Sequence, residues 1–149
     1  MLVPLFLCIG FMIAVLYIDL QFDLLALPYR RGRRPLPADV LESIARYYRC
    51  ITKNPYLLMF VMLTTVVGLV SEVMYDLVPR WAGYSSLVLM GVTMATGTIK
   101  IIPTAQRLAA GKDPVDEQTR MVYSIFPFHL LVLTTVLLLA AVQFSTTFK

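Results

Sequence analysis

The chain of 149 residues is 58% hydrophobic and only 15% charged, whereas soluble domains contain about 25% charged residues. Long apolar runs exclude a soluble globular domain and indicate a single integral membrane domain over residues 1–149. The net charge of +4 does not indicate nucleic-acid binding, because the basic residues lie at the ends of apolar runs, where membrane topology accounts for them.

Four long apolar runs predict transmembrane helices at about residues 2–27, 55–77, 84–105 and 122–144. Each run is close to the roughly 20 residues that a helix needs to cross a bilayer. The runs are too long for membrane strands, and their side chains do not alternate in polarity. The chain is therefore expected to fold as an all-α, four-helix transmembrane bundle.

The connection between the first two spans is expected to contain an additional helix at about residues 39–53. Asp39 is placed to cap this helix, with Glu42 three residues later as in a capping box. Basic residues lie on the other faces of the helix, so the pattern predicts an amphipathic helix at the membrane interface. The apolar stripe consists of Val40, Ile44, Tyr47, Tyr48 and Ile51.

Basic residues are distributed unequally between the two ends of the predicted bundle. Eleven of the 13 Lys and Arg residues lie in or beside the first and third connections, and the other two are Arg80 and Lys149. Because short loops rich in Lys and Arg stay on the cytoplasmic side, both basic connections are expected there, or on the matrix or stromal side. Both termini are then expected on the opposite side.

Four arginines follow the first span and are candidate contacts for anionic lipid: Arg30, Arg31, Arg33 and Arg34. Near an anionic lipid surface each contributes about 1 kcal/mol to binding, so the lipid bilayer is an expected partner of this segment. The alternative is that the four residues only set the topology, and the two roles are compatible.

Four ionisable residues within the predicted spans form a candidate intramembrane polar cluster: Asp19, Asp23, Lys100 and His129. With a rise of 1.5 Å per residue, Asp19, Lys100 and His129 all lie roughly 10–14 Å from the basic ends of their spans. Asp19 and Asp23 share one helix face because they are four residues apart. A lone cation in hydrocarbon is costly, so Lys100 is expected to contact Asp19, Asp23 or His129.

Such a cluster suits an ion-paired network that sets helix register, a proton relay, or a site for the polar head of a lipophilic ligand. A metal site is not expected, because the chain has a single histidine and no spaced set of ligands. The sequence also contains no phosphate-binding loop, haem motif or nucleophile elbow, and no cofactor is expected.

Short motifs mark the ends of two spans: Leu27-Pro28 in the first, and Pro103-Thr104 with Arg107-Leu108 in the third. Together with the chain length and the number of spans, they give a layout that resembles the anthrone-oxygenase-like family of small four-helix membrane proteins. The resemblance covers nearly the whole chain and implies action on a hydrophobic aromatic or polyketide-like substrate. No position matches a catalytic residue of that family, so the resemblance assigns none.

Three functions remain open. The leading hypothesis is an accessory or structural subunit of a larger membrane complex, whose partners are other membrane proteins or further copies of the chain. The second is a small membrane enzyme acting on a lipophilic substrate, which requires a cavity reaching Lys100, Asp19 and His129. The third is a small proton-coupled exporter that uses an intramembrane carboxylate.

Overall fold

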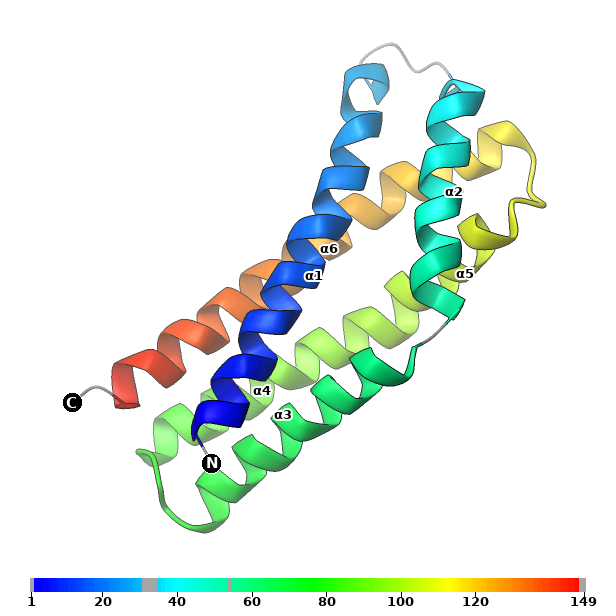
Figure 1. The fold of residues 1–149 in the computed structure, drawn as a ribbon. Coiled ribbons are helices and arrows are strands. Elements are labelled where there is room, and N and C mark those ends of the chain that lie inside the picture. The colour runs from blue at the N-terminus through cyan, green and yellow to red at the C-terminus, as the bar shows by residue number, and fades with distance from the viewer. Residues whose placement is uncertain (1, 31–34, 54, 148–149) are drawn as a thin grey trace.

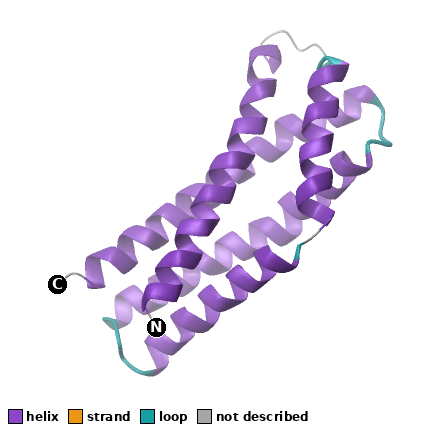
Figure 2. Ribbon diagram, viewed as in Figure 1, coloured by secondary structure: helices purple, strands orange, loops and turns teal. Residues whose placement is uncertain are grey.

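The computed structural model describes residues 2–30, 35–53 and 55–147. These ranges contain no strand, so the predicted all-α fold is confirmed (Figure 2). The helices, in chain order, are α1 (Leu2–Arg30), α2 (Ala38–Lys53), α3 (Tyr56–Met74), α4 (Arg80–Thr96), the short π-helix η1 (Gly97–Ile101), α5 (Ile102–Ala110) and α6 (Val115–Thr147).

The helices form an elongated bundle of four columns (Figure 1). α1 and α6 are two columns, α4, η1 and α5 follow one another as the third, and α2 and α3 make the fourth with a bend between them. α1 begins, α6 ends and α3 turns into α4 at one end of the bundle, which we call the terminal end. The start of α2 and the α5–α6 turn lie at the opposite, basic end, which carries Arg30, Arg107 and Arg120.

Four helical stretches are long and apolar enough to cross a bilayer: Val3–Arg30, Tyr56–Met74, Arg80–Ala110 and Val115–Thr146. They coincide with the four predicted spans and support a membrane protein built as a helical bundle. The second stretch ends at Met74, three residues before the predicted boundary, while the other three extend beyond their predicted boundaries.

Neither Pro28 nor Pro103 ends its helical column. Pro28 lies inside the last turn of α1, which continues to Arg30. Pro103 lies at the start of α5, directly after η1. Proline removes a backbone donor, and the wider turn of a π-helix allows the α4–α5 column to continue past Pro103. The hydroxyl of Thr104 donates to the carbonyl oxygen of Lys100 at 2.7 Å, which satisfies a backbone acceptor beside the proline.

Buried apolar side chains form two clusters, one toward each end of the bundle. The part of α1 and α6 between these clusters carries Asp19, Asp23 and His129, all of them buried. The basic-end core consists of Ala26, Leu36, Leu41, Ile44, Tyr48, Ala105, Leu108, Ala109, Met121, Val122 and Ile125. The terminal-end core consists of Leu5, Ile9, Met12, Leu16, Val61, Leu69, Met90, Val132, Val136 and Leu139.

Helix α2 occupies almost the predicted range, and its apolar face packs on the bundle, mainly on α5. Its buried residues are Leu41, Ile44, Ala45 and Tyr48, whereas Ile51 of the predicted stripe remains 38% exposed. The helix already begins at Ala38, so Asp39 lies in its first turn and is not the residue before it. The side chain of Glu42 pairs with Arg49 at 2.5 Å. The interfacial position of α2 remains a prediction.

Candidate functional site

Asp23 of α1 and His129 of α6 form a buried pair between the two core clusters. The Nδ1 atom of His129 lies 2.6 Å from Oδ2 of Asp23, and the two residues are 0% and 3% exposed respectively. A residue pair separated by 106 positions thus joins the first and last helices of the bundle. The sequence analysis proposed both residues, and the fold brings them into direct contact.

Asp19 lies one helical turn before Asp23 on the same face of α1 and receives a hydrogen bond from α2. The hydroxyl of Tyr47 donates to Oδ1 of Asp19 at 2.5 Å. The ring of Tyr47 also stacks on Phe22 of α1, with the ring centroids 3.9 Å apart. Burial, and then the neighbouring Asp19 carboxyl group, raise the pKa of Tyr47, so its hydroxyl keeps the proton that it donates.

Tyr48 of α2 lies in the basic-end core beside the Asp23–His129 pair. Its side chain is 1% exposed, and its hydroxyl makes no hydrogen bond within the described residues. Burial, and then the nearby Asp23 and Asp19 carboxyl groups, raise the pKa of Tyr48. Tyr47 and Tyr48 had been assigned to the apolar stripe of an interfacial helix, so their position beside the carboxyl groups was not anticipated.

Lys100 does not join this group. Its side chain is exposed, and the hydrogen bonds and ion pairs of the described residues link Asp19 to Tyr47 and Asp23 to His129, but neither pair to Lys100. Lys100 lies in η1, none of whose residues is buried. The expected four-residue cluster is therefore corrected to Asp19, Asp23 and His129, with Tyr47 as the added member.

An apolar cavity of about 80 Å³ lies next to these residues, and Asp19 and His129 are part of its wall. The rest of the wall comes from α1, α3, the α4–α5 column and α6, and includes Met12, Leu16, Met62, Ile101, Val132 and Val136. The Nε2 atom of His129 is buried and has no hydrogen-bond partner among the described residues. A buried, unpaired ring nitrogen is uncommon, so an acceptor or donor on a bound molecule is a natural partner for it.

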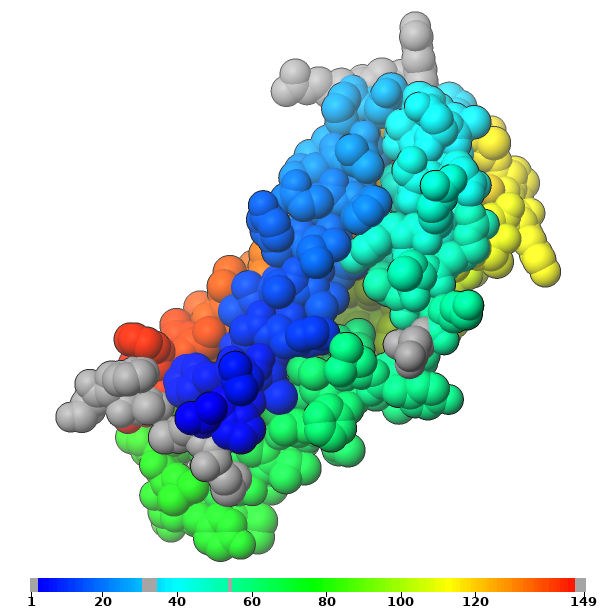
Figure 3. Space-filling view, in the orientation of Figure 1, coloured from blue at the N-terminus to red at the C-terminus, as the bar shows by residue number. Residues whose placement is uncertain are grey.

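The cavity reaches the surface of the bundle between helices. Among its lining residues, Val15 and Leu58 are half-buried and Ile102 is exposed. Figure 3 shows the face on which α1, α2 and α3 meet, where the surface is hollowed. These lining residues lie in helices long enough to cross a bilayer, so a molecule dissolved in lipid can approach the cavity from the side.

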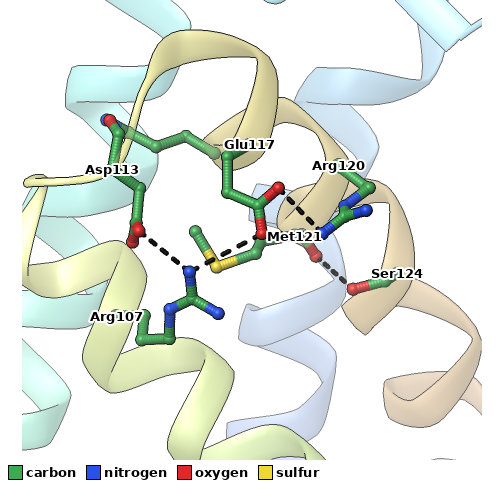
Figure 4. Close-up of polar contacts among 7 residues, drawn as sticks. Arg107, Asp113, Glu117, Arg120, Met121 and Ser124 are labelled. Carbon is green, nitrogen blue, oxygen red and sulfur yellow. Dashed lines mark hydrogen bonds and ion pairs between the residues drawn. The ribbon is translucent and has the colours of Figure 1, made fainter.

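Charged residues of the α5–α6 turn form a network of their own (Figure 4). Arg107 of α5 pairs with Asp113 at 2.8 Å and with Glu117 at 3.6 Å, and Arg120 pairs with Glu117 at 2.8 Å. Both arginine side chains are more than half exposed, so each pair contributes little to stability. The network joins α5 to α6 at the basic end and has no part in the buried site.

Of the four arginines proposed to contact lipid, the structure describes one. Arg30 ends α1 and is exposed, whereas Arg31, Arg33 and Arg34 lie outside the described residues. Within the described ranges, no group of three or more His, Cys, Asp or Glu side chains is arranged to hold a metal ion.

The fold and the site define a helical membrane bundle with a buried carboxyl–imidazole pair beside an apolar cavity. No family model matches the chain, and no curated protein or solved structure matches it either.

Replacing Tyr47 by phenylalanine is expected to lower the free energy of unfolding by about 1–3 kcal/mol. The substitution keeps the stacking on Phe22 and removes only the hydroxyl that donates to the buried Asp19. Unfolding by a denaturing detergent in mixed micelles, followed by circular dichroism, measures the change. Tyr75→Phe is the matched control, since that residue is 71% exposed, and an equal loss in both variants would contradict the assigned role of Tyr47.

Proposed function

We propose that this protein is a small membrane enzyme that binds the polar end of a lipophilic molecule and transfers a proton to or from it through His129. The observation that carries the proposal is the unpaired, buried Nε2 atom of a histidine that is held by Asp23 and lines an apolar cavity. A histidine oriented in this way by a carboxylate is the common arrangement of a general acid–base residue.

Asp23 determines how His129 works. By accepting the hydrogen of Nδ1, the Asp23 carboxylate fixes the tautomer in which Nε2 carries the lone pair. Nε2 then takes a proton from the bound molecule, and Asp23 stabilises the imidazolium that forms. Asp19 supplies a second polar group in the cavity wall, and Tyr47 orients it through its hydrogen bond.

The size and lining of the cavity define the class of substrate. Its volume of about 80 Å³ is well below the roughly 300–1,000 Å³ that encloses a drug-sized ligand. The cavity therefore accommodates one polar end of a molecule, and the apolar remainder stays between the helices or in the bilayer. An aromatic ketone or a phenol with an apolar tail suits this description, as does the aromatic substrate that the anthrone-oxygenase-like layout implies.

Binding is tested with a photoreactive alkylphenol added to the protein in mild detergent. Met62→Trp, which fills part of the cavity, is expected to lower cross-linking at α1 and α6 at least tenfold, which corresponds to about 1.4 kcal/mol of binding. Leu63→Trp is the matched control, because Leu63 is the next residue of α3 and is 63% exposed. Equal cross-linking in both variants would refute binding in this cavity.

Proton transfer is tested with a long-chain aryl ketone, whose acidic carbon-bound hydrogens exchange slowly in deuterated water. His129→Gln is expected to lower the protein-dependent exchange by about 10²–10⁴-fold. If the protein is instead a subunit of a larger membrane complex, purification in mild detergent is expected to recover stoichiometric protein partners with it. Exchange that is no faster with the wild-type protein than with vesicles alone would contradict an enzyme of this class.

We further propose that the basic end faces the cytoplasm, matrix or stroma and that the terminal end faces the opposite side, as the distribution of Lys and Arg indicates. Cys50 is exposed on α2 and provides a native reporter. In a Cys8→Ser background, an impermeant thiol reagent added outside intact cells is expected to leave Cys50 unlabelled until the membrane is opened. Labelling of Cys50 in intact cells would reverse the orientation.

A further inference from the structure

A second buried polar group lies at the terminal end, far from the Asp23–His129 pair. Glu72 of α3 is 2% exposed, and Nε2 of Gln143 from α6 donates to its Oε2 atom at 2.9 Å. The same nitrogen donates to Oγ of Ser86 from α4 at 3.0 Å. The other carboxyl oxygen of Glu72, Oε1, is buried and has no hydrogen-bond partner among the described residues.

Within the described residues, Glu72 has no cationic partner. The charged groups of the adjoining turn, Asp76 and Arg80, are more than two-thirds exposed and pair with each other at 3.7 Å. None of the ion pairs between described residues includes Glu72. Among the described residues, the other titratable groups toward the terminal end are Tyr75 of the turn, Cys8 of α1 and Tyr84 of α4. Tyr17, Asp19, Asp23, Tyr29 and Arg30 of α1 lie farther toward the basic end, and residues 130–146 of α6 contain no titratable group. An unpaired carboxylate is costly in hydrocarbon, so the neutral, protonated acid is the favoured form.

The turn that follows Glu72 encloses a space large enough to hold water. A pocket of about 300 Å³ lies in the α3–α4 turn, and Val73, Asp76, Val78, Arg80, Gly83 and Tyr84 line it. Val73 directly follows Glu72, and the backbone carbonyl oxygen of Glu72 accepts a hydrogen bond from the amide of Leu77 at 2.9 Å. A Cβ atom on Gly83 would lie 2.6 Å from Cγ2 of Val73, so glycine permits the close packing of α4 on the end of α3.

We propose that Glu72, Gln143 and Ser86 form a proton-binding site that exchanges its proton with water in the pocket at the terminal end. On binding, an O–H bond forms at Oε1 of Glu72 while an O–H bond of a hydronium ion breaks and leaves water. On release, the same steps run in reverse. The amide nitrogen that Gln143 directs toward Glu72 is a donor, whereas a metal cation needs several oxygen ligands, so the proton is the ligand of this site.

The site is independent of the function proposed for the cavity. Gln143 follows His129 by 14 positions on α6, which places the two polar groups roughly 21 Å apart along the helix axis. The terminal-end core also lies in this part of the bundle. Three of its fully buried apolar residues are Leu69, Met90 and Leu139. A failure of ligand binding in the cavity therefore leaves the Glu72 site standing, and the reverse also holds.

Dicyclohexylcarbodiimide, a lipophilic reagent that adds to protonated carboxyl groups, tests the proposal on the intact protein in detergent. Peptide mass mapping is expected to find the adduct on Glu72 and not on the exposed Asp76. Above the titration midpoint, labelling is expected to fall about tenfold for each pH unit, as the protonated fraction does. Glu72→Gln is expected to abolish the adduct at this position.

A second variant distinguishes proton binding by Glu72 from mere reactivity of its carboxyl group toward the carbodiimide. Gln143→Leu removes the donor that stabilises the ionised carboxylate, so labelling of Glu72 is expected to persist to a higher pH than in the wild-type protein. The proposal is overturned if wild-type Glu72 carries no adduct, or if its labelling does not change with pH. Protection of Glu72 by sodium ions at constant pH would also overturn it, since the site would then bind a metal cation.

Discussion

Replacing His129 by leucine is expected to lower the free energy of unfolding by about 3–5 kcal/mol, because it leaves the buried Asp23 carboxylate without its partner. The Asp23 carboxyl group loses the contact at 2.6 Å and has no water to replace it. Asp23→Leu is expected to have a loss of similar size for the same reason. Unfolding in mixed micelles measures both variants.

The double variant Asp23→Leu with His129→Leu separates two free energies. One is the cost of leaving a single polar side chain buried and unpaired, and the other is the net stabilisation by the Asp23–His129 contact. The double variant is expected to recover most of the stability lost in either single variant, because no polar group is then left buried and unpaired. It is also expected to lose the proton transfer proposed for His129 while the bundle remains folded. Strictly additive losses would show that the two side chains are not energetically coupled.

Leu139→Ala is expected to lower the free energy of unfolding by about 2–5 kcal/mol, because the deletion leaves a cavity in the terminal-end core. Leu139 is 0% exposed and packs among the apolar residues of α1, α3 and α4. Helices in a bilayer associate through close packing and not through exclusion of water, so the lost contacts between side chains account for the effect. The same unfolding measurement in mixed micelles applies.

Leu138→Ala is the matched control for this effect. Leu138 precedes Leu139 on α6, but it is 52% exposed on the outer face of the bundle, where lipid or detergent fills the space of the deleted atoms. The change in stability is expected to stay within about 0.5 kcal/mol. Equal losses at the two positions would contradict the orientation of α6 in the bundle.

The predicted spans followed from the length of apolar runs, and they agree with the structure because hydrophobic length is a property of each segment alone. The predicted ends of the first and third spans, at about residues 27 and 105, were too early, since a proline can lie in a last turn or follow a π-turn without ending the helix. The choice of Asp23 and His129 also followed from the sequence, because ionisable residues in apolar runs usually face the protein interior.

Other members of the site depended on contacts that no local pattern contains. Tyr47 fell on the apolar stripe of α2, and that stripe indicated a buried face without identifying Asp19 as the group it meets. Lys100 lies about as far from the basic end of its span as Asp19 and His129 do from theirs. It nevertheless belongs to η1, where its side chain is exposed. Glu72 and Asp76 are four residues apart in the sequence, yet Glu72 is buried against Gln143 and Asp76 is exposed.

The sequence by itself therefore determined that this is an all-helical membrane protein, where its apolar helices lie, and which ionisable residues fall within them. Composition and position along a helix are enough for those conclusions, because the bilayer acts on each segment separately. Only the tertiary structure decided that Asp23 meets His129, that α2 joins the site through Tyr47, and that Lys100 stays outside it. These contacts depend on how each helix is rotated about its axis and which helices are neighbours, and packing of the whole bundle sets both.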